Sequence, residues 1–447
     1  MGKRILIVGD WGSTEQVYEG LQRICDEGHT LISFSDENFI PIRPVYAEMH
    51  TFDFTDYTLA QNYIRDNNIR FDAVMSTCCE LVPPLVALLA QEYGCIGNTP
   101  HSAFLCRSKY HMRQQLQKAG IPQPPFSLCK SYGEVKQAIA TIGAPCVVKP
   151  VGGHSSFGAF FVGPDTNPAE LQKQYETSRD YMFGHSVRDI KQINRISTEE
   201  FRSMGIAEEV DMVLDFLVEG FLDGHEISVD ALVQDGNVLV TGIADQERMP
   251  LPYFVQVSER MPYLCGAEEE MHIHTLVHDT VHAVGVTNSP VHVEIMLTAN
   301  GPRIVEIACR MGSDNIHDSV YKTTGIHLME EAARIAMGEK ITAKPERNGH
   351  YAMQYILPEQ SGVFERIDIP QELRDDPDVT EIEVTAKPGE SVSPPPDFFD
   401  FLGYIGVRGD SPEDADAKLT DAFGQIRVRY REDGTGSLNP DMMQSSV

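Results

Sequence analysis

Residues 147–158 of the sequence read Val147-Val148-Lys149-Pro150-Val151-Gly152-Gly153-His154-Ser155-Ser156-Phe157-Gly158. This stretch predicts an apolar strand that ends near a lysine, followed by a glycine-rich loop. A lysine in an apolar strand is costly to bury unless it meets an anion. The glycines would let backbone N–H groups approach phosphate oxygens. The order of residues is not that of a P-loop, and a flexible hairpin with a solvated lysine is an equally good interpretation of the stretch alone.

Further along the chain, two glutamates, Glu294 and Glu306, stand in apolar runs joined by the turn signal Asn300-Gly301. Asn-Gly between alternating apolar residues predicts a hairpin, which would bring the two carboxylates together. Carboxylates that share one place repel unless a cation lies between them, and hard oxygen ligands favour Mg²⁺ or Mn²⁺. The alternative is a pair of outward-facing strand acids. Arg310 follows, and its guanidinium could bind a carboxylate or stabilise a developing oxyanion.

A third feature is the segment 217–226, Leu-Val-Glu-Gly-Phe-Leu-Asp-Gly-His-Glu, which reads as strand, short break and strand. It carries Glu219 near one end and Glu226 at the other. A backbone segment that crosses between two domains with a glutamate at each end suits the recognition of adenine and ribose. The pattern by itself is weakly specific.

The first hundred residues alternate between apolar strand patterns (4–8, 30–34 and 73–76) and longer stretches at 15–25 and 81–93. Such alternation predicts a doubly wound parallel sheet. Trp11 stands where a dinucleotide-binding turn has its middle glycine, so we interpret this turn as a tight strand-to-helix connection.

Composition narrows the function classes. The chain has 447 residues and a net charge of −30, and its length suggests about three domains. This acidity disfavours nucleic acid and membrane surfaces as partners. The longest apolar stretch, Leu81–Ala90, is too short to span a bilayer, and the start lacks a signal-peptide pattern. Nine cysteines without a Cys-x-x-Cys pair are typical of reduced thiols, so we expect a cytoplasmic protein.

Taken in order over roughly residues 4–340, these features resemble the ATP-grasp superfamily of ADP-forming carboxylate–amine ligases. The resemblance implies that ATP and Mg²⁺ (or Mn²⁺) are cofactors and that Arg310, Lys149 and Glu306 act in catalysis. It implies nucleotide contacts by Lys109, Lys149, Gly152, Gly153, His154, Ser155, Ser156, Phe157, Gly158, Glu219, Phe221, Leu222 and Glu226. It also implies that Glu294 and Glu306 bind the metal and that Arg310 supports an acyl-phosphate and a tetrahedral intermediate.

One departure points to a branch of this superfamily. Many members carry Glu-x-Asn in the second metal strand, but this chain has Glu306-Ile307-Ala308, followed by Arg310. The Glu-x-Ala-x-Arg pattern resembles the L-amino-acid ligases, which make dipeptides or amino-acid amides. The segment 345–447, with candidate strands Tyr351–Leu357 and Tyr404–Arg408, is similar to the small cap domain of that branch.

The resemblance implies an α/β fold (α+β overall) of the ATP-grasp type. Its expected parts are an N-terminal doubly wound domain (1–105), a lid subdomain (106–215), a catalytic core (216–345), a cap domain (346–432) and a flexible tail (433–447).

The implied activity is the condensation of an activated carboxylate, expected to be an amino acid, with an amine, expected to be a second amino acid. A homodimer is also expected. The alternatives are an ATP-grasp ligase of nucleotide or cofactor biosynthesis acting on another small acid, and a non-catalytic ATP-binding regulator. No general base for the amine stands out.

Two further groups of residues are candidates. Substrate contacts are expected from Glu247, Arg248, Asp314, Asn315 and His317, each of which could instead be an ordinary polar residue of a loop. His272, His274, His278 and His282 recur at helical spacing. A zinc site there is conceivable, but ordinary surface or core histidines are the favoured interpretation.

Overall fold

The computed structural model describes residues 2–10, 14–36, 39–187, 194–252, 254–313, 315–394 and 401–431. It divides into two compact units. The large unit comprises Met1–Ile243 and Leu264–Glu346, and the small unit comprises Ala244–Tyr263 and Arg347–Val447. The five-part division expected from the sequence is finer than this and stays a prediction, and its tail, 433–447, lies outside the described residues.

The helices of the large unit are α1 (Glu15–Asp26), α2 (Tyr57–Asp66), α3 (Pro83–Tyr93), α4 (Pro100–Leu105), α5 (Lys109–Ala119), α6 (Tyr132–Ile142), α7 (Pro168–Val187), α8 (Thr198–Ser203), α9 (Ala267–Val284), α10 (Ile316–Thr324) and α11 (Leu328–Met337).

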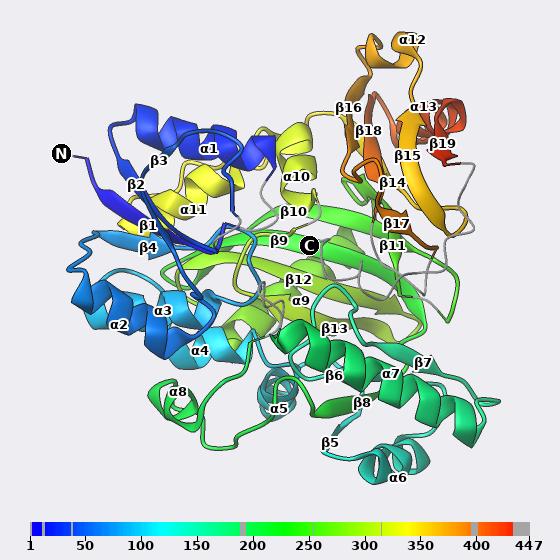
Figure 1. Ribbon diagram of the computed structural model, residues 1–447, viewed down its shortest axis with the longest axis horizontal. Helices are drawn as coiled ribbons and strands as arrows, with labels where there is room; N and C mark the ends of the chain where they lie inside the picture. The colour runs from blue at the N-terminus through cyan, green and yellow to red at the C-terminus, as the bar shows by residue number, and fades with distance from the viewer. Residues whose placement is uncertain are drawn as a thin grey trace. The chain divides into compact units, whose positions relative to one another are not determined.

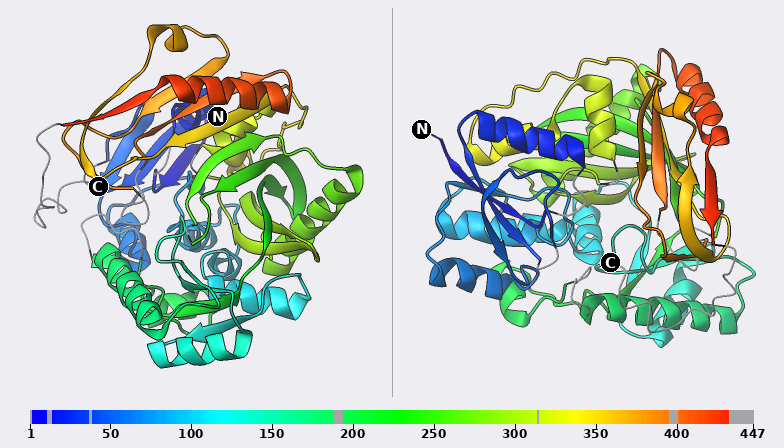
Figure 2. Two further views of the ribbon diagram at one scale, coloured as in Figure 1. Left: turned by 90° about the vertical axis from the view of Figure 1, so that its right-hand side faces the viewer. Right: turned by 45° about the horizontal axis from the view of Figure 1, so that its top comes forward.

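A parallel four-stranded sheet opens the chain. Its strands are β1 (Arg4–Val8), β2 (Thr30–Ser35), β3 (Tyr46–Thr51) and β4 (Ala73–Met75), in the order β3-β2-β1-β4. Leu6, Val8 and Phe34 alternate onto one face and pack in a core with residues of α2 and α3. Figures 1 and 2 show α1 and α11 on the opposite face. The predicted doubly wound sheet is confirmed, and only its mostly exposed edge strand, β3, was not predicted.

The glycine-rich stretch belongs to a second, antiparallel sheet. Its strands are β5 (Phe126–Cys129), β6 (Cys146–Pro150), β7 (Phe160–Val162) and β8 (Phe216–Gly220), in the order β5-β8-β6-β7. Val148 and Val218 face a core that includes Tyr175 of α7. Because neighbours along a strand point to opposite faces, Lys149 lies on the other face from this core.

The predicted glutamate hairpin forms the edge of a third group of antiparallel strands. In the large unit these are β9 (Gly224–Gln234), β12 (Ser289–Thr298), β13 (Gly301–Ala308) and the first part of β10 (Asn237–Arg248), with β12 between β13 and β9. The hairpin turns at Thr298–Gly301, and Glu294 pairs directly with Glu306. The predicted hairpin is therefore confirmed, and a register shift between Glu294 and Ile295 places the two glutamates directly opposite each other.

The small unit is built on antiparallel strands with one covering helix. Its strands are the last residues of β10, β11 (Gln256–Met261), β14 (His350–Ile356), β15 (Gly362–Asp368), β16 (Val379–Val384), β17 (Ser391–Val392), β18 (Gly403–Gly409) and β19 (Arg427–Tyr430), and its helices are α12 (Gln371–Arg374) and α13 (Pro412–Gln425). Ile405 and Val407 of β18 pack against Leu419 of α13. The candidate strands at 351–357 and 404–408 are confirmed as β14 and β18.

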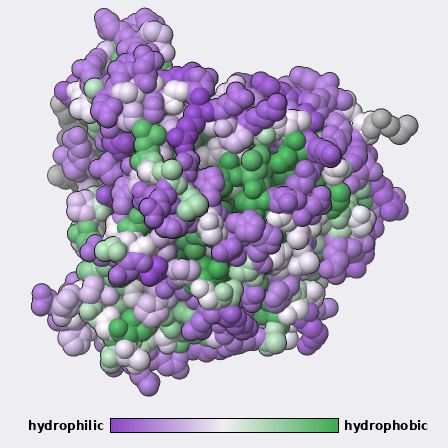
Figure 3. Space-filling view, turned by 180° about the vertical axis from the view of Figure 1, so that it is seen from behind, coloured by the Kyte–Doolittle hydropathy of each residue, from purple (hydrophilic) through white to green (hydrophobic). Residues whose placement is uncertain are grey.

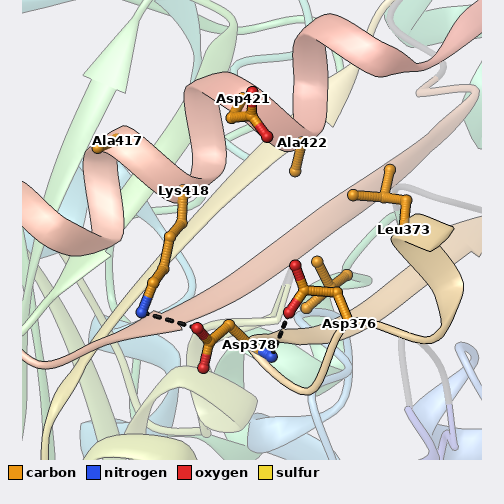
Figure 4. Close-up of a pocket in the computed structure, with 8 residues that line it drawn as sticks. Leu373, Asp376, Asp378, Ala417, Lys418, Asp421 and Ala422 are labelled. Carbon is orange, nitrogen blue, oxygen red and sulfur yellow. Dashed lines mark hydrogen bonds and ion pairs between the residues drawn. The ribbon is translucent and has the colours of Figure 1, made fainter.

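A pocket of about 250 Å³ lies in the small unit beside α13 and includes three aspartates. Lys418 Nζ bonds Asp378 at 2.9 Å, and the backbone N–H of Asp378 donates to Asp376 (Figure 4). None of the predicted site residues lines this pocket.

Hydrophilic residues predominate on the face seen in Figure 3, and hydrophobic residues gather there in a few patches. Among the helices of the described residues, none is both long and apolar enough to cross a bilayer.

Candidate active site

Lys149 is anchored by a buried cluster of three charges. Its Nζ lies 2.8 Å from Glu219 Oε2. In the pairing of β6 with β8, Val147 lies directly opposite Glu219, so the two side chains are on the same side of the sheet. Lys149 is two residues after Val147 and therefore lies on that side too. Arg113 of α5 reaches the same carboxylate, with Nε 2.7 Å from Oε1 and Nη2 3.1 Å from Oε2.

The electrostatics of this cluster favour an anion nearby. Burial opposes ionisation of Glu219, but Arg113 and then Lys149 outweigh it and lower its pKa to about 2. Burial lowers the pKa of Lys149, although Glu219 counteracts the effect. When both cations are charged, two positive charges face one negative charge, so a single net positive charge remains in a place of low dielectric.

A second lysine joins the glycine-rich loop to the hairpin. Lys109, the first residue of α5, donates from Nζ to Gly153 O and to Glu306 Oε1, the latter at 2.8 Å. Its backbone N–H bonds Val151 O, so the start of α5 is fixed to the end of β6. Three residues that are far apart in the sequence therefore meet at one point: Lys109, Gly153 and Glu306.

The glycine-rich loop has a backbone that few sequences can adopt. Ser155 and Ser156 have φ values of 45° and 57°, a region that is strained for residues with a side chain. A Cβ at Gly152 would lie 2.5 Å from Met212 O, so only glycine fits. Phe157 packs against Tyr181 of α7 at a ring distance of 5.6 Å. The loop thus presents backbone groups beside Lys109 while one aromatic side chain holds it to α7.

The two hairpin glutamates lie side by side as predicted, and their donor set fits a hard divalent cation. Glu306 meets Lys109, and Glu294 Oε1 lies 3.9 Å from His292 Nε2. Within the described residues, no three His, Cys, Asp or Glu side chains already surround one point closely enough to hold a metal. The pair would therefore need further ligands, such as phosphate oxygens.

Arg310 is paired with a glutamate that the sequence analysis did not single out. Its Nε donates to Glu80 Oε2 at 2.7 Å, and its Nη1 donates to Met311 O at 2.7 Å. Burial opposes ionisation of Glu80, but Arg310 and then Arg107 outweigh it and lower its pKa. Arg310 is thus a half-buried guanidinium whose orientation is fixed by a buried carboxylate.

The residues expected around adenine and ribose lie at the junction of β8 and β9. The carboxylate of Glu219 points to Lys149 and Arg113, as described. The backbone N–H of Phe221 bonds Pro145 O, and its ring meets Phe161 edge-on at 5.2 Å. Leu222 is half-buried and Glu226 is buried near the start of β9. Their contacts to a nucleotide stay a prediction.

Of the expected substrate residues, His317 and Asn315 belong to the large unit and Glu247 and Arg248 to the small unit, while Asp314 lies outside the described residues. His317 is fully buried, with Nε2 2.9 Å from Thr14 Oγ1 and Nδ1 2.9 Å from Gly312 O. Burial would lower the pKa of His317, but Cys78 and Asp318 outweigh it and raise it to about 10. Asn315 is also buried and caps α10 in a left-handed conformation. Glu247 accepts bonds from Ser258 and Arg260.

His278 and His282 of α9 are exposed and lie 3.1 Å apart through their Nε2 atoms. They are part of no group of three metal-ligating side chains in the described ranges.

Comparisons with known proteins agree with this geometry. Residues 142–318 match the ATP-grasp domain, so the chain carries an ATP-grasp domain. Residues 354–431 match the L-amino acid ligase C-terminal domain 2, so the chain also carries the C-terminal module of the branch that it resembles in sequence.

Individual relatives show the same pattern. The crystal structure of L-amino acid ligase from Bacillus licheniformis is 22% identical, with a TM-score of 0.77 over 96% of this chain and 99% of that chain. Carnosine synthase 1 of Mus musculus is 26% identical over 78% of this chain and 42% of its own length. Alanine–anticapsin ligase of Bacillus subtilis (strain 168) is 26% identical over 60% of this chain and 52% of its own length. The chain thus spans about half the length of these two curated relatives.

Proposed function

We propose that this protein is an ADP-forming ligase that activates the carboxylate of one amino acid and joins it to the amine of a second. The observation that carries the proposal is the meeting of Lys109 with both Gly153 O and Glu306 Oε1. It brings a lysine, a glycine-rich loop and an acid of the hairpin to one point, and Lys149 adds a second cation. Loop N–H groups and ammonium groups bind phosphate, and carboxylates bind its counter-ion.

In this reaction an oxygen of the acid attacks the γ-phosphorus of ATP, and the bond from that phosphorus to the β-phosphate oxygen breaks. ADP leaves and an acyl-phosphate forms. The amine then attacks the acyl carbon, phosphate leaves, and the nitrogen loses a proton. Lys109 and Lys149 would hold the phosphates in line, which is the main requirement of phosphoryl transfer.

Magnesium held by Glu294 and Glu306 would neutralise charge on the nucleotide phosphates. Arg310 would stabilise the negative oxygen that develops when the amine attacks. Its ion pair with buried Glu80 supports this role, because a guanidinium that is already oriented need not reorganise during the reaction. The loop 152–158 would exclude water from the acyl-phosphate.

The substrate class is proposed from the relatives. Carnosine synthase, alanine–anticapsin ligase and L-amino acid ligase are all named for joining amino acids or amino-acid-like molecules. We propose Glu247, Arg248, Asp314, Asn315 and His317 as residues that select the two substrates. We also propose, from the family resemblance, that the protein acts as a homodimer in the cytoplasm.

The test is product analysis. The protein would be incubated with ATP, Mg²⁺ and pooled amino acids, and ADP, AMP, phosphate and new masses would be quantified. We expect ADP and phosphate in equal amounts, with a product whose mass is that of two amino acids less one water. A Glu306→Gln variant should form none, and an exposed-site control, Glu269→Gln, should match the wild type. Formation of AMP would contradict the acyl-phosphate route.

A further inference from the structure

Two arginines of the large unit are completely buried, but they differ in their hydrogen bonds. Arg107 is 1% exposed and Arg113 is 0% exposed. Arg113 donates to both oxygens of Glu219 and to the carbonyl oxygens of Ile304 and Val305. The three side-chain nitrogens of Arg107 are buried too, yet within the described part of the chain no atom accepts a hydrogen bond from any of them. Because such burial is costly, this guanidinium calls for an explanation other than the stability of the fold.

Arg107 lies in the short connection between α4 and α5, next to the segment that follows β4. Its backbone N–H donates to Phe104 O at 3.0 Å. Phe104 packs in one hydrophobic core with Cys79, the residue that precedes Glu80. Burial would raise the pKa of Glu80, and the cations that lower it most are Arg310 and then Arg107. The charge of Arg107 therefore acts on the carboxylate of Glu80.

The charges of this group do not cancel. Glu80 is buried, and its Oε2 lies 2.7 Å from Arg310 Nε. These two side chains alone would form a neutral pair, so an oxyanion that approached Arg310 would also be repelled by Glu80. Arg107 adds a second cation, and two cations with one carboxylate leave one positive charge in surplus. In a place of low dielectric this surplus charge is weakly screened.

We propose that Arg107 is a positioning residue for the amide-forming step, which offsets the charge of Glu80 and thereby leaves Arg310 electropositive toward the developing oxyanion. The inference rests on the proposed function, in which Arg310 stabilises that oxyanion. The side-chain nitrogens of Arg107 are buried, so it acts through its neighbours and does not touch the substrate. A charge that is fixed before the reaction stabilises the transition state without reorganising.

The test compares two substitutions of Arg107 in the full-length protein. Arg107→Met removes the charge and keeps a long side chain, whereas Arg107→Lys keeps the charge. We expect Arg107→Met to lower the turnover number for amide formation about 10- to 100-fold, less than the loss of a direct oxyanion donor, with the KM values for ATP and the amino acids unchanged. Arg107→Lys should retain most of the turnover, because no hydrogen bond has to be replaced.

Thermal denaturation supplies a readout that a structural role would move in the opposite direction. Replacing a buried charge that lacks partners with an apolar side chain removes a desolvation cost, so the melting temperature of Arg107→Met should equal or exceed that of the wild type. Arg113→Lys is the matched control. It keeps a charge but loses the forked bonds to Glu219, so its melting temperature should fall.

The outcomes separate this inference from the proposed function. If Arg107→Met loses melting temperature together with turnover, Arg107 belongs to the scaffold and the inference is overturned. A raised KM for an amino acid at unchanged turnover would assign Arg107 to direct substrate binding and would overturn it too, as would Arg107→Lys that is as inactive as Arg107→Met. In each of these cases the ligase proposal stands. If the wild type forms no amide product from ATP and the pooled amino acids, the proposed function fails and this inference with it.

Discussion

Two glutamates, Glu219 and Glu306, are each paired with a lysine expected to bind phosphate, yet their surroundings differ. The side chain of Glu219 is 5% exposed and meets two cations, Lys149 at 2.8 Å and Arg113 at 2.7 Å. The side chain of Glu306 is 19% exposed and meets Lys109 at 2.8 Å. Because Glu219 is deeply buried and has two cationic partners, we interpret its pairing as part of the scaffold. Glu306 is more exposed and has one such partner, so its carboxylate can exchange Lys109 for another cation. A lysine–glutamate pair can therefore stabilise the fold at one place and help to bind a cation at another.

The largest effect should come from Glu219→Gln. The variant would leave Arg113 and Lys149 buried without their anion, and removal of one partner of a buried ion pair costs about 3–5 kcal/mol. Chemical denaturation would measure the loss in unfolding free energy. The matched variant Glu306→Gln should lose less, because Glu306 is more exposed and Lys109 keeps its bond to Gly153 O. Equal losses in the two variants would contradict the comparison.

Glu306→Gln should instead remove the activity. We expect ADP formation to fall at least about 1,000-fold, equivalent to about 4 kcal/mol of barrier, while the folded structure persists. ADP release measured by a coupled assay, with circular dichroism as the check on folding, would decide this. Turnover within tenfold of wild type in a folded variant would show that the metal site lies elsewhere.

Arg310→Ala should lower product formation about 100- to 1,000-fold and change ATP affinity by less than a factor of two. Arg310→Lys serves as its control, because a cation remains opposite buried Glu80. Calorimetric titration and product assays would separate the two quantities. A parallel fall in binding and turnover would assign Arg310 to ground-state binding.

The pH dependence of stability sharpens the contrast further. The pKa of Glu219 is about 2 in the folded protein, against an ordinary value of 4.5. A depressed folded pKa adds stability that is complete above pH 4.5 and is lost as the pH falls toward 2, a contribution of roughly 3 kcal/mol. The difference in unfolding free energy between wild type and Glu219→Gln should therefore shrink as the pH is lowered from 5 to 3. A constant difference would show that Glu219 is not the group being titrated.

The smallest effect is expected from Gly158→Ala in the loop. Gly158 has a φ of 73°, and a Cβ there would lie 2.8 Å from both Pro150 Cγ and Ser178 Oγ, so a loss of about 1 kcal/mol is expected. Gly424→Ala, in α13 and with open space around the site, should raise the melting temperature slightly. Thermal denaturation of both variants would check the opposite signs.

The parts of the site that could be predicted from the sequence are those in which neighbouring residues carry the signal. Lys149 ends an apolar run beside its glycines, and the turn signal Asn300-Gly301 between apolar runs predicted the hairpin that brings Glu294 and Glu306 together. Strand β3 has too few apolar residues to show a pattern, because it lies at an exposed edge.

The remaining residues depend on contacts between distant parts of the chain. Glu80 and Arg310 are 230 positions apart, and Arg113 looks like any charged helix residue until its buried partner is known. The position of Glu219 in its segment predicted adenine contact, but only the structure shows that its carboxylate turns toward Lys149.

The interleaving of the two units in the chain has a consequence for synthesis on the ribosome. The small unit begins with Ala244–Tyr263 but resumes only at Arg347. Strand β11 therefore emerges well before β14, which covers one of its edges in the finished fold. During that interval its backbone groups stay available to other chains, a known route to aggregation. The edge of β11 that pairs with β14 therefore stays open until the rest of the large unit, Leu264–Glu346, has been synthesised.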